Sequence, residues 1–307
     1  MIAFASAVTK PEVYDQFAEP GILLSSEPDS VNLSGPARGS IYASYNHFLN
    51  EAAVLDDLEA LVLLHQDAEI VDPNFAAKVR DVFADPMVGV AGPVAAVGVR
   101  SIAWWEGSTT WASFIHRHQE LGGGDFPSIT WDEADLPAYA RLGEVDSVDG
   151  FLMVLSPWVV RNIRFDESLG HALHGYDFDL CLQVREAGRK IVSANLRAVH
   201  NHSLQLADDL DSWMDAHVAI AEKWDGRIRQ VGWADGSWSQ RARRSEAKAS
   251  AGVALAQAEE MRAAAYSRAT ERAIGEIRRS VSWRLTAPLR AVGMRWRSFR
   301  RRAECAP

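Results

Sequence analysis

The sequence predicts an α/β fold with a mostly parallel sheet flanked by helices, followed by a C-terminal helical extension. Continuous apolar runs, such as Leu61 to Leu64, are typical of strands buried on both faces. Between these runs, apolar residues recur at the spacing of amphipathic helices. From Arg241 to Ser280 the chain is Ala-rich and charged with few large apolar residues, which favours a long exposed helix.

The first half of the chain alternates strands and helices. Residues 1–8 are expected to form a strand, and a further short strand is expected at 22–24 or 31–33. A helix over residues 40–57 is indicated by its apolar spacing: Ile41, Tyr45, Phe48, Leu49 and Ala52. After the central strand at 61–64, Asp72 and Pro73 are expected to open the next helix as its cap and first residue.

The second half continues the alternation after an interruption. The expected elements are strands at 88–93 and 145–156, a short helix at 157–163, a helix ending at Gly188, a strand at 190–194 and a helix at 208–225. The expected organisation is an α/β domain at 1–231, a linker and Ala-rich charged helix at 232–280, and a basic amphipathic tail at 281–307.

Composition and charge limit the class of protein. With 307 residues, 48% of them hydrophobic, the chain can bury a large core. No apolar run reaches the ~18 residues of a membrane span and no signal peptide is evident, so a cytoplasmic location is expected. Residues 1–240 carry a net charge of minus 19 and residues 241–307 plus 10. This split disfavours nucleic-acid binding by the body and suits a tail that meets anionic partners.

Acidic and imidazole side chains follow the expected strands. Asp67 and Glu69 come after the central strand and could share one hard divalent cation, although an ordinary strand-to-helix turn is the alternative. Asp177 and Asp179 start a helix, where carboxylates also serve as caps. His200 follows the strand at 190–194, and a histidine in that position is more often structural than a metal ligand.

Residues 100–142 break the alternation with four tryptophans and a triple glycine, Gly122 to Gly124. Three glycines suit a hinge or lid loop, and Trp104 and Trp105 could stack on a ring-shaped substrate. Packing in the core or at a dimer contact is the alternative for each tryptophan.

These motifs, taken in order, resemble the catalytic domain of glycosyltransferase family 2, which has the GT-A fold, and especially a bacterial branch whose central motif is H-Q-D. The resemblance covers residues 1 to about 225. The matching pieces are S-Y-N at 44–46, L-L-H-Q-D-A-E at 63–69, D-P-N-F at 72–75, G-V-A-G-P at 89–93, V-D-G-F-L at 148–152, R-F-D-E at 164–167, H-G-Y-D-F-D-L-C-L-Q-V-R-E-A-G at 174–188 and V-H-N-H-S at 199–203.

The resemblance implies a role for particular residues. Asp67 and Glu69 would occupy the Asp-X-Asp position and, with His200, hold Mn²⁺ or Mg²⁺ on a nucleotide-sugar diphosphate. Asp177 would be the general base. The donor would be bound by Asn46, Gln66 and Asp67, and the acceptor by Trp104, Trp105, Asp149, Gly150, Tyr176 and Asp179.

The sequence also departs from the family pattern. The usual first-strand P-x-Y-N and second-strand D-D-G-S are absent, which leaves Glu27 or Asp29 as the acidic residues available for the donor nucleoside. Glu69 replaces the usual second Asp, and Tyr176 stands where many relatives carry Glu.

The function implied is an inverting, metal-dependent glycosyltransferase that moves a sugar from a nucleotide-sugar to a cell-surface glycan or lipid-linked acceptor. A metal-dependent phosphoester hydrolase and a non-catalytic scaffold are the alternatives. In the tail, Leu285, Leu289, Val292, Trp296 and Phe299 form one apolar stripe among arginines. Such a helix suits an anionic membrane surface, so peripheral attachment is expected, with packing on the body or in a homodimer as the alternative.

Overall fold

A computed structural model describes residues 1–97, 99, 101–102, 108–112, 114–118, 124–125, 143–169, 174–201, 210–224, 227, 260–264 and 266–286. The chain forms two compact units, Met1–Ala258 and Glu259–Pro307. The finer division expected at residues 231 and 280 stays a prediction. Among the described residues, no helix combines the length and apolar character needed to cross a membrane.

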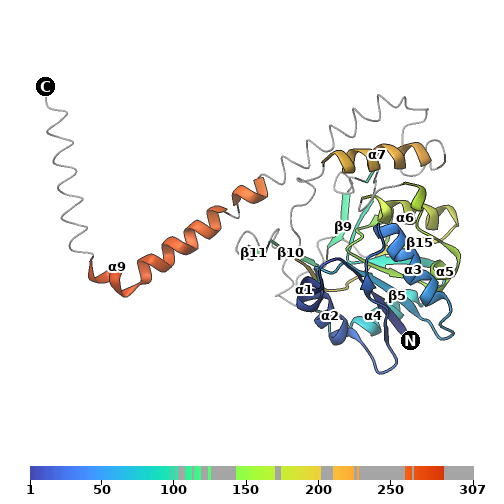
Figure 1. The fold of residues 1–307 in the computed structure, drawn as a ribbon, viewed down its shortest axis with the longest axis horizontal. Helices are drawn as coiled ribbons and strands as arrows, with labels where there is room; N and C mark the ends of the chain where they lie inside the picture. The colour runs from blue at the N-terminus through green and yellow to red at the C-terminus, as the bar shows by residue number, and fades with distance from the viewer. Residues whose placement is uncertain are drawn as a thin grey trace. The chain divides into compact units, whose positions relative to one another are not determined.

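The first unit is organised around a seven-stranded sheet (Figure 1). Its strands, in spatial order, are β12 (Glu144–Val145), β15 (Lys190–Ser193), β7 (Val88–Gly92), β14 (Leu152–Leu155), β5 (Ala60–Leu64), β1 (Ile2–Ala5) and β3 (Val31–Asn32). Five of them run in one direction, while β14 and β12 are antiparallel to their neighbours. The sheet is therefore mostly parallel, as expected, with β14 inserted antiparallel between β5 and β7.

Helices cover both faces of this sheet (Figure 1). One face packs on α3 (Ile41–Ala53), α5 (Pro157–Asn162) and α6 (Tyr176–Glu186). The other packs on η1 (Tyr14–Ala18), α2 (Glu19–Ser25) and α4 (Phe75–Phe83), with α1 (Pro11–Val13) leading into η1. Because side chains alternate along a strand, Leu61 and Leu63 of β5 face the first layer and Val62 and Leu64 the second. The expected α/β fold is confirmed.

Smaller sheets extend the body beyond the central one. A four-stranded sheet has the order β11 (Gly124–Asp125), β10 (Phe114–His118), β16 (Ala198–His200) and β6 (Ala68–Ile70). A three-stranded sheet contains β13 (Ser147–Val148), β8 (Val94–Val97) and β9 (Ser108–Ala112), and β2 (Ala7–Val8) pairs with β4 (Gly35–Pro36). Helix α7 (Leu210–Trp224) packs on α6 through a third apolar cluster, and η4 (Glu167–Leu169) is a short turn between α5 and α6.

Some expected elements differ in the structure. Residues 22–24 lie in α2, whereas the alternative at 31–33 forms β3. The helix expected from Pro73 starts at Phe75, after Asn74. The Asp72 carboxylate accepts from Asn74 N at 3.1 Å and from Lys78 Nζ at 2.5 Å, so it holds the turn that precedes α4. The strand expected over 145–156 is divided among β12, β13 and β14.

The second unit is helical where it is described. Residues 260–264 and 266–279 form helix, and α9 (Val281–Leu285) follows, with the Ser280 Oγ accepting from Trp283 N. Ile277, Val281 and Leu285 are exposed. The tail helix expected from Thr286 and Pro288 lies almost wholly outside the described residues.

Candidate active site

A tight turn between β5 and β6 carries the H-Q-D motif. Strand β5 ends at Leu64, and the turn is closed by a hydrogen bond from Ala68 N to His65 O at 3.1 Å. His65 N also donates to Phe151 O at 2.9 Å, which ties the turn to the segment directly before β14. The motif therefore lies at the carboxyl end of a buried strand, where open α/β sheets bind their ligands.

Strand pairing brings His200 to this turn. Strand β16 pairs antiparallel with β6, with His200 opposite Ala68, and Asn201 N donates to Asp67 O at 2.8 Å. The sequence predicts the same proximity for a different reason, namely that the strands before Asp67 and His200 are neighbours in one sheet. That reason is wrong, because β7 and β14 separate β5 from β15.

His65, Asp67 and His200 form a cluster in which one ligand atom of each lies within 4.8 Å of the others. Asp67 Oδ1 is 3.5 Å from His200 Nε2 and 3.9 Å from His65 Nδ1. Donor atoms that bind one cation at ~2.0–2.2 Å lie roughly 3–4.4 Å apart, so these separations fit a shared divalent ion. We call these three residues the histidine–aspartate cluster.

Packing restricts the two rings of the cluster. His200 is buried and stacks on Phe151, with ring centroids 4.6 Å apart and an interplanar angle of 12°. The His65 ring meets His200 edge-on at 5.6 Å. Burial lowers the pKa of His65 to about 4, an effect that the Asp67 carboxylate only partly offsets. His65 is therefore neutral at physiological pH, the form in which imidazole binds metals.

Asp177 lies in the first turn of α6. Its Oδ2 accepts from Gly150 N at 3.0 Å and its Oδ1 from Phe178 N at 2.8 Å, so both oxygens are held by backbone donors. Burial and, to a smaller extent, the nearby Asp149 carboxylate together raise the pKa of Asp177 to about 7. A carboxylate that titrates near neutrality suits a general base.

The residue before Asp177 links α6 to the cluster. The Tyr176 hydroxyl lies 2.6 Å from His65 Nε2 in a buried position. Asp177 follows Tyr176 and accepts from the backbone of Gly150, the residue before Phe151, whose ring stacks on His200. The general-base candidate is therefore held by two segments that also contact the histidine–aspartate cluster.

Comparison with known proteins identifies the family. Residues 36–222, more than half of the chain, match the model described as "Glycosyltransferase like family". This chain belongs to that family.

Individual relatives are distant. The glycosyltransferase-like chain is 27% identical over 203 residues to the streptomycin biosynthesis protein StrF of Streptomyces griseus, covering 66% of this chain and 67% of StrF. Among solved structures it is similar to the mannosyltransferase PcManGT of Pyrobaculum calidifontis in complex with GDP-Man and Mn²⁺, with 14% identity, 94% and 83% of the two chains covered and a TM-score of 0.48. It is also similar to GalNAc-T7 with UDP, GalNAc and Mn²⁺, with 10% identity, 80% and 54% covered and a TM-score of 0.43.

Glu69 is not a member of the histidine–aspartate cluster of this glycosyltransferase-like chain. It lies on β6 opposite Val199, one position along from the Ala68–His200 pair. Because successive side chains of a strand point to opposite faces, Glu69 and His200 lie on opposite faces of the β6–β16 ladder. The third member of the cluster is His65, for which the sequence predicted no role as a ligand. The H-x-D spacing within a tight turn is the signal that could have found it.

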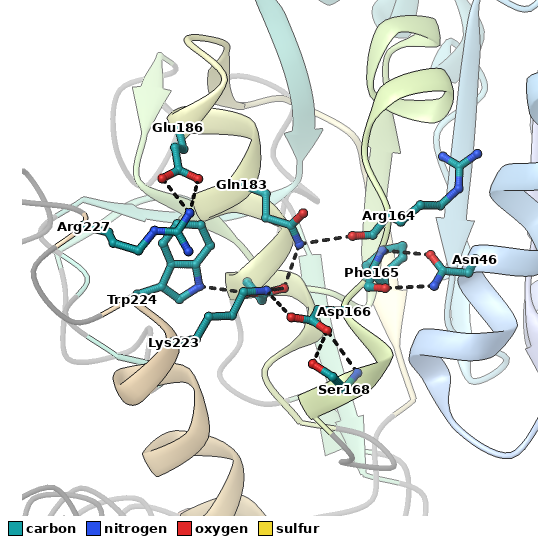
Figure 2. A network of polar contacts seen from close by, with 11 residues as sticks. Asn46, Arg164, Phe165, Asp166, Ser168, Gln183, Glu186, Lys223, Trp224 and Arg227 are labelled. Atoms are coloured by element: carbon teal, nitrogen blue, oxygen red, sulfur yellow. Dashed lines mark hydrogen bonds and ion pairs between the residues drawn. The ribbon is translucent and has the colours of Figure 1, made fainter.

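Two predicted donor-binding residues, Gln66 and Asn46, form hydrogen bonds with the backbone. Gln66 Oε1 accepts from Thr9 N at 2.8 Å and Lys10 N at 2.9 Å, which ties the turn to the loop after β2. Asn46 makes two 2.8 Å hydrogen bonds with the backbone of Phe165, as Figure 2 shows. In the glycosyltransferase-like chain both amides therefore have structural roles, and their part in donor binding stays a prediction.

The predicted acceptor-binding residues divide into three groups. Asp149, Gly150 and Tyr176 lie beside Asp177, and burial raises the pKa of Asp149. Trp104 and Trp105 lie outside the described residues. Asp179 is fully buried and accepts hydrogen bonds from Gln183, Lys223 and Trp224. Figure 2 shows these three donors pointing toward one another. The role of Asp179 in the structure is to join α6 to α7.

The acidic residues suggested for the donor nucleoside lie at the other end of the sheet. Both oxygens of Glu27 accept from Arg80, which also binds Glu59 directly before β5. Asp29 is 3.6 Å from the amino group of Met1, directly before β1. Both are therefore at the amino ends of β1 and β5, opposite the His65–Asp67 turn, which corrects that suggestion.

Proposed function

We propose that this chain is an inverting, divalent-metal-dependent glycosyltransferase that moves a sugar from a nucleotide-sugar to a cell-surface glycan or lipid-linked acceptor. The observation that carries the proposal is the histidine–aspartate cluster beside Asp177. Membership of the family supports the reaction class. The H-Q-D motif would be this chain's variant of the Asp-X-Asp motif.

The proposed metal ligands are His65, Asp67 and His200. Two imidazoles and one carboxylate suit Mn²⁺, and Mg²⁺ less well because it prefers oxygen ligands. When bound, the divalent cation offsets the negative charge of the departing diphosphate. Asp67 also contributes to donor binding through the same carboxylate.

Asp177 is the proposed general base. The acceptor hydroxyl oxygen forms a bond to the anomeric carbon of the sugar while the bond from that carbon to the diphosphate oxygen breaks. The hydroxyl proton passes to the Asp177 carboxylate. Because the attack comes from the side opposite the leaving group, the configuration at the anomeric carbon inverts. Proton transfer of this kind contributes ~10²–10⁴-fold to the rate.

The acceptor side is proposed to include Asp149 and Gly150, which adjoin Asp177. Trp104 and Trp105 would stack on the acceptor sugar. The basic tail would hold the protein at an anionic membrane, where a lipid-linked acceptor is found. If full-length protein fails to float with anionic vesicles at low salt, or floats equally well when truncated after Ser280, the membrane part of the proposal is wrong.

The metal site is tested by calorimetric titration with Mn²⁺. Wild type should bind, and Asp67→Asn should lose at least tenfold in affinity. Glu69→Gln is the matched control, since it makes the same chemical change two residues away, outside the cluster. Equal losses in the two variants would return Glu69 to the ligand set.

The reaction is tested by incubating the protein with UDP-, dTDP- and GDP-sugars, Mn²⁺ and candidate acceptors. Transfer of the sugar to an acceptor supports the proposal. Hydrolysis of the donor to a nucleoside monophosphate and a sugar 1-phosphate, without sugar transfer, would favour a phosphoester hydrolase. Mn²⁺ binding without turnover of any donor would favour a non-catalytic scaffold.

A further inference from the structure

The hydrogen bond between Tyr176 and His65 connects α6 to the H-Q-D turn, 111 positions apart in sequence. At 2.6 Å it is short for a hydrogen bond to a ring nitrogen. Tyr176 is 4% exposed, so little water competes for its hydroxyl. The family resemblance assigns Tyr176 to acceptor binding, at a position where many relatives carry Glu.

The surroundings of Tyr176 hold its hydroxyl in one place. Its ring packs edge-on against Tyr42 and Tyr45, with centroids 6.2 and 5.6 Å away, and tilted against Phe165 at 6.0 Å. On the remaining side is Gly150, where an added Cβ would lie 2.1 Å from the Tyr176 hydroxyl oxygen and 2.5 Å from its Cζ. The Tyr176 hydroxyl therefore occupies space that is open because Gly150 has no side chain.

The two nitrogens of His65 have different neighbours. Nε2 meets Tyr176, whereas Nδ1 faces Asp67 Oδ1 at 3.9 Å. A neutral imidazole carries a single N–H. If Nδ1 binds a cation, the hydrogen is on Nε2 and is donated to the Tyr176 oxygen. A partner on the second nitrogen commonly fixes both the tautomer and the orientation of a metal-binding histidine.

We propose that Tyr176 is a positioning residue that fixes the His65 ring so that it binds the divalent cation through Nδ1. This inference rests on the proposed metal site. It also gives the first turn of α6 two roles, since Tyr176 orients a metal ligand while Asp177 receives the acceptor proton. Any movement of α6 would then change the metal site and the position of the base together.

Tyr176→Phe tests the inference, with Tyr42→Phe as the matched control. Tyr42 is also buried in the same aromatic group, but its hydroxyl donates to His174 O at 2.7 Å and not to the cluster. Removing the Tyr176 hydroxyl should weaken Mn²⁺ binding ~10–100-fold by calorimetry, the usual effect of losing the partner of a metal-binding histidine. Tyr42→Phe should leave the Mn²⁺ affinity within about twofold of wild type while lowering the melting temperature.

The outcomes separate this inference from the proposed function. If wild type binds Mn²⁺ and Tyr176→Phe binds it equally well, or if both variants lose the same affinity, Tyr176 has no positioning role and the metal site stands. If wild type binds no Mn²⁺, the metal site itself is refuted, and the inference with it.

A measurement on the wild-type protein covers the case in which Tyr176→Phe does not fold. Long-range ¹H–¹⁵N spectra of the histidine rings, recorded with the diamagnetic ion Zn²⁺, identify which nitrogen of His65 is coordinated and which is protonated. Coordination through Nδ1 with hydrogen on Nε2 is expected. Coordination through Nε2 would overturn the inference, because that nitrogen could not then be held by Tyr176.

Discussion

Removing the buried charge of Asp179 should destabilise the first unit strongly. Asp179 is 0% exposed, and its oxygens accept from Trp224 Nε1 at 2.8 Å and Gln183 Nε2 at 2.8 Å. Lys223 Nζ lies 2.7 and 2.9 Å from the two oxygens. In Asp179→Asn the amide NH₂ would face these donors, and the Lys223 charge would lose a buried partner.

The size of the effect follows from the geometry. Breaking a buried ion pair by removing one partner costs ~3–5 kcal/mol, and we expect about 3 because Lys223 keeps Asp166 at 2.7 Å. In a domain of this size that corresponds to a melting temperature lower by roughly 6–12 °C. Urea denaturation followed by circular dichroism gives the change in unfolding free energy directly.

The surface pair of Glu186 and Arg227 provides the control. Its side chains are 44% and 47% exposed, and Arg227 Nη2 lies 2.7 Å from Glu186 Oε2. Glu186→Gln should cost only ~0–1 kcal/mol, because water screens an exposed pair. An Asp179→Asn loss no larger than that of Glu186→Gln would refute the reasoning that burial sets the strength of this network.

The remaining predictions concern Asp177 and two glycines. Transferase activity should fall as the pH drops below about 7, because burial raises the pKa of Asp177 to about 7 and only the ionised carboxylate accepts a proton. Asp177→Asn should lower kcat ~10²–10⁴-fold. An Asp177→Asn variant that keeps most of its activity would show that Asp177 is not the base. Gly175→Ala should destabilise more than Gly188→Ala in urea denaturation. Both glycines have φ near +80°, at a cost of ~1–2 kcal/mol for a side chain, but only at Gly175 would the Cβ meet a neighbour, Ile220 Cδ1 at 2.3 Å. Equal losses would contradict the contact argument.

The order of the elements could be predicted from the sequence because it depends on local patterns. The run from Leu61 to Leu64 is apolar on both faces, and β5 is indeed covered on both sides. The helical spacing that begins at Ile41 corresponds to α3, which starts where the Ser40 side chain accepts from Ala43 N. The position of Asp67 could also be predicted from the sequence around it, because a polar residue directly after a buried strand lies at the end of that strand.

The partners of each side chain depended on the tertiary structure. Asp67 and Asn46 are both polar residues in matching family motifs, yet the first lies in the histidine–aspartate cluster and the second binds the Phe165 backbone. Asp177 and Asp179 are two residues apart in the same helical turn, but one is beside the cluster and the other is buried under α7. A local pattern specifies the position of a residue on its element, not what is packed against it.

The composition of the candidate metal site was also decided by long-range pairing. The order of strands and helices along the chain does not specify the register in which two strands pair. A shift of one residue in that register moves every side chain of a strand to the other face of the sheet. The observed register places His200 opposite Ala68 and therefore puts Glu69 on the far face of the ladder. The packing of α6 brings Tyr176, more than a hundred residues away in sequence, to His65. The sequence alone thus determined the fold class and the turn at which the site forms, whereas strand register and helix packing determined which side chains complete it.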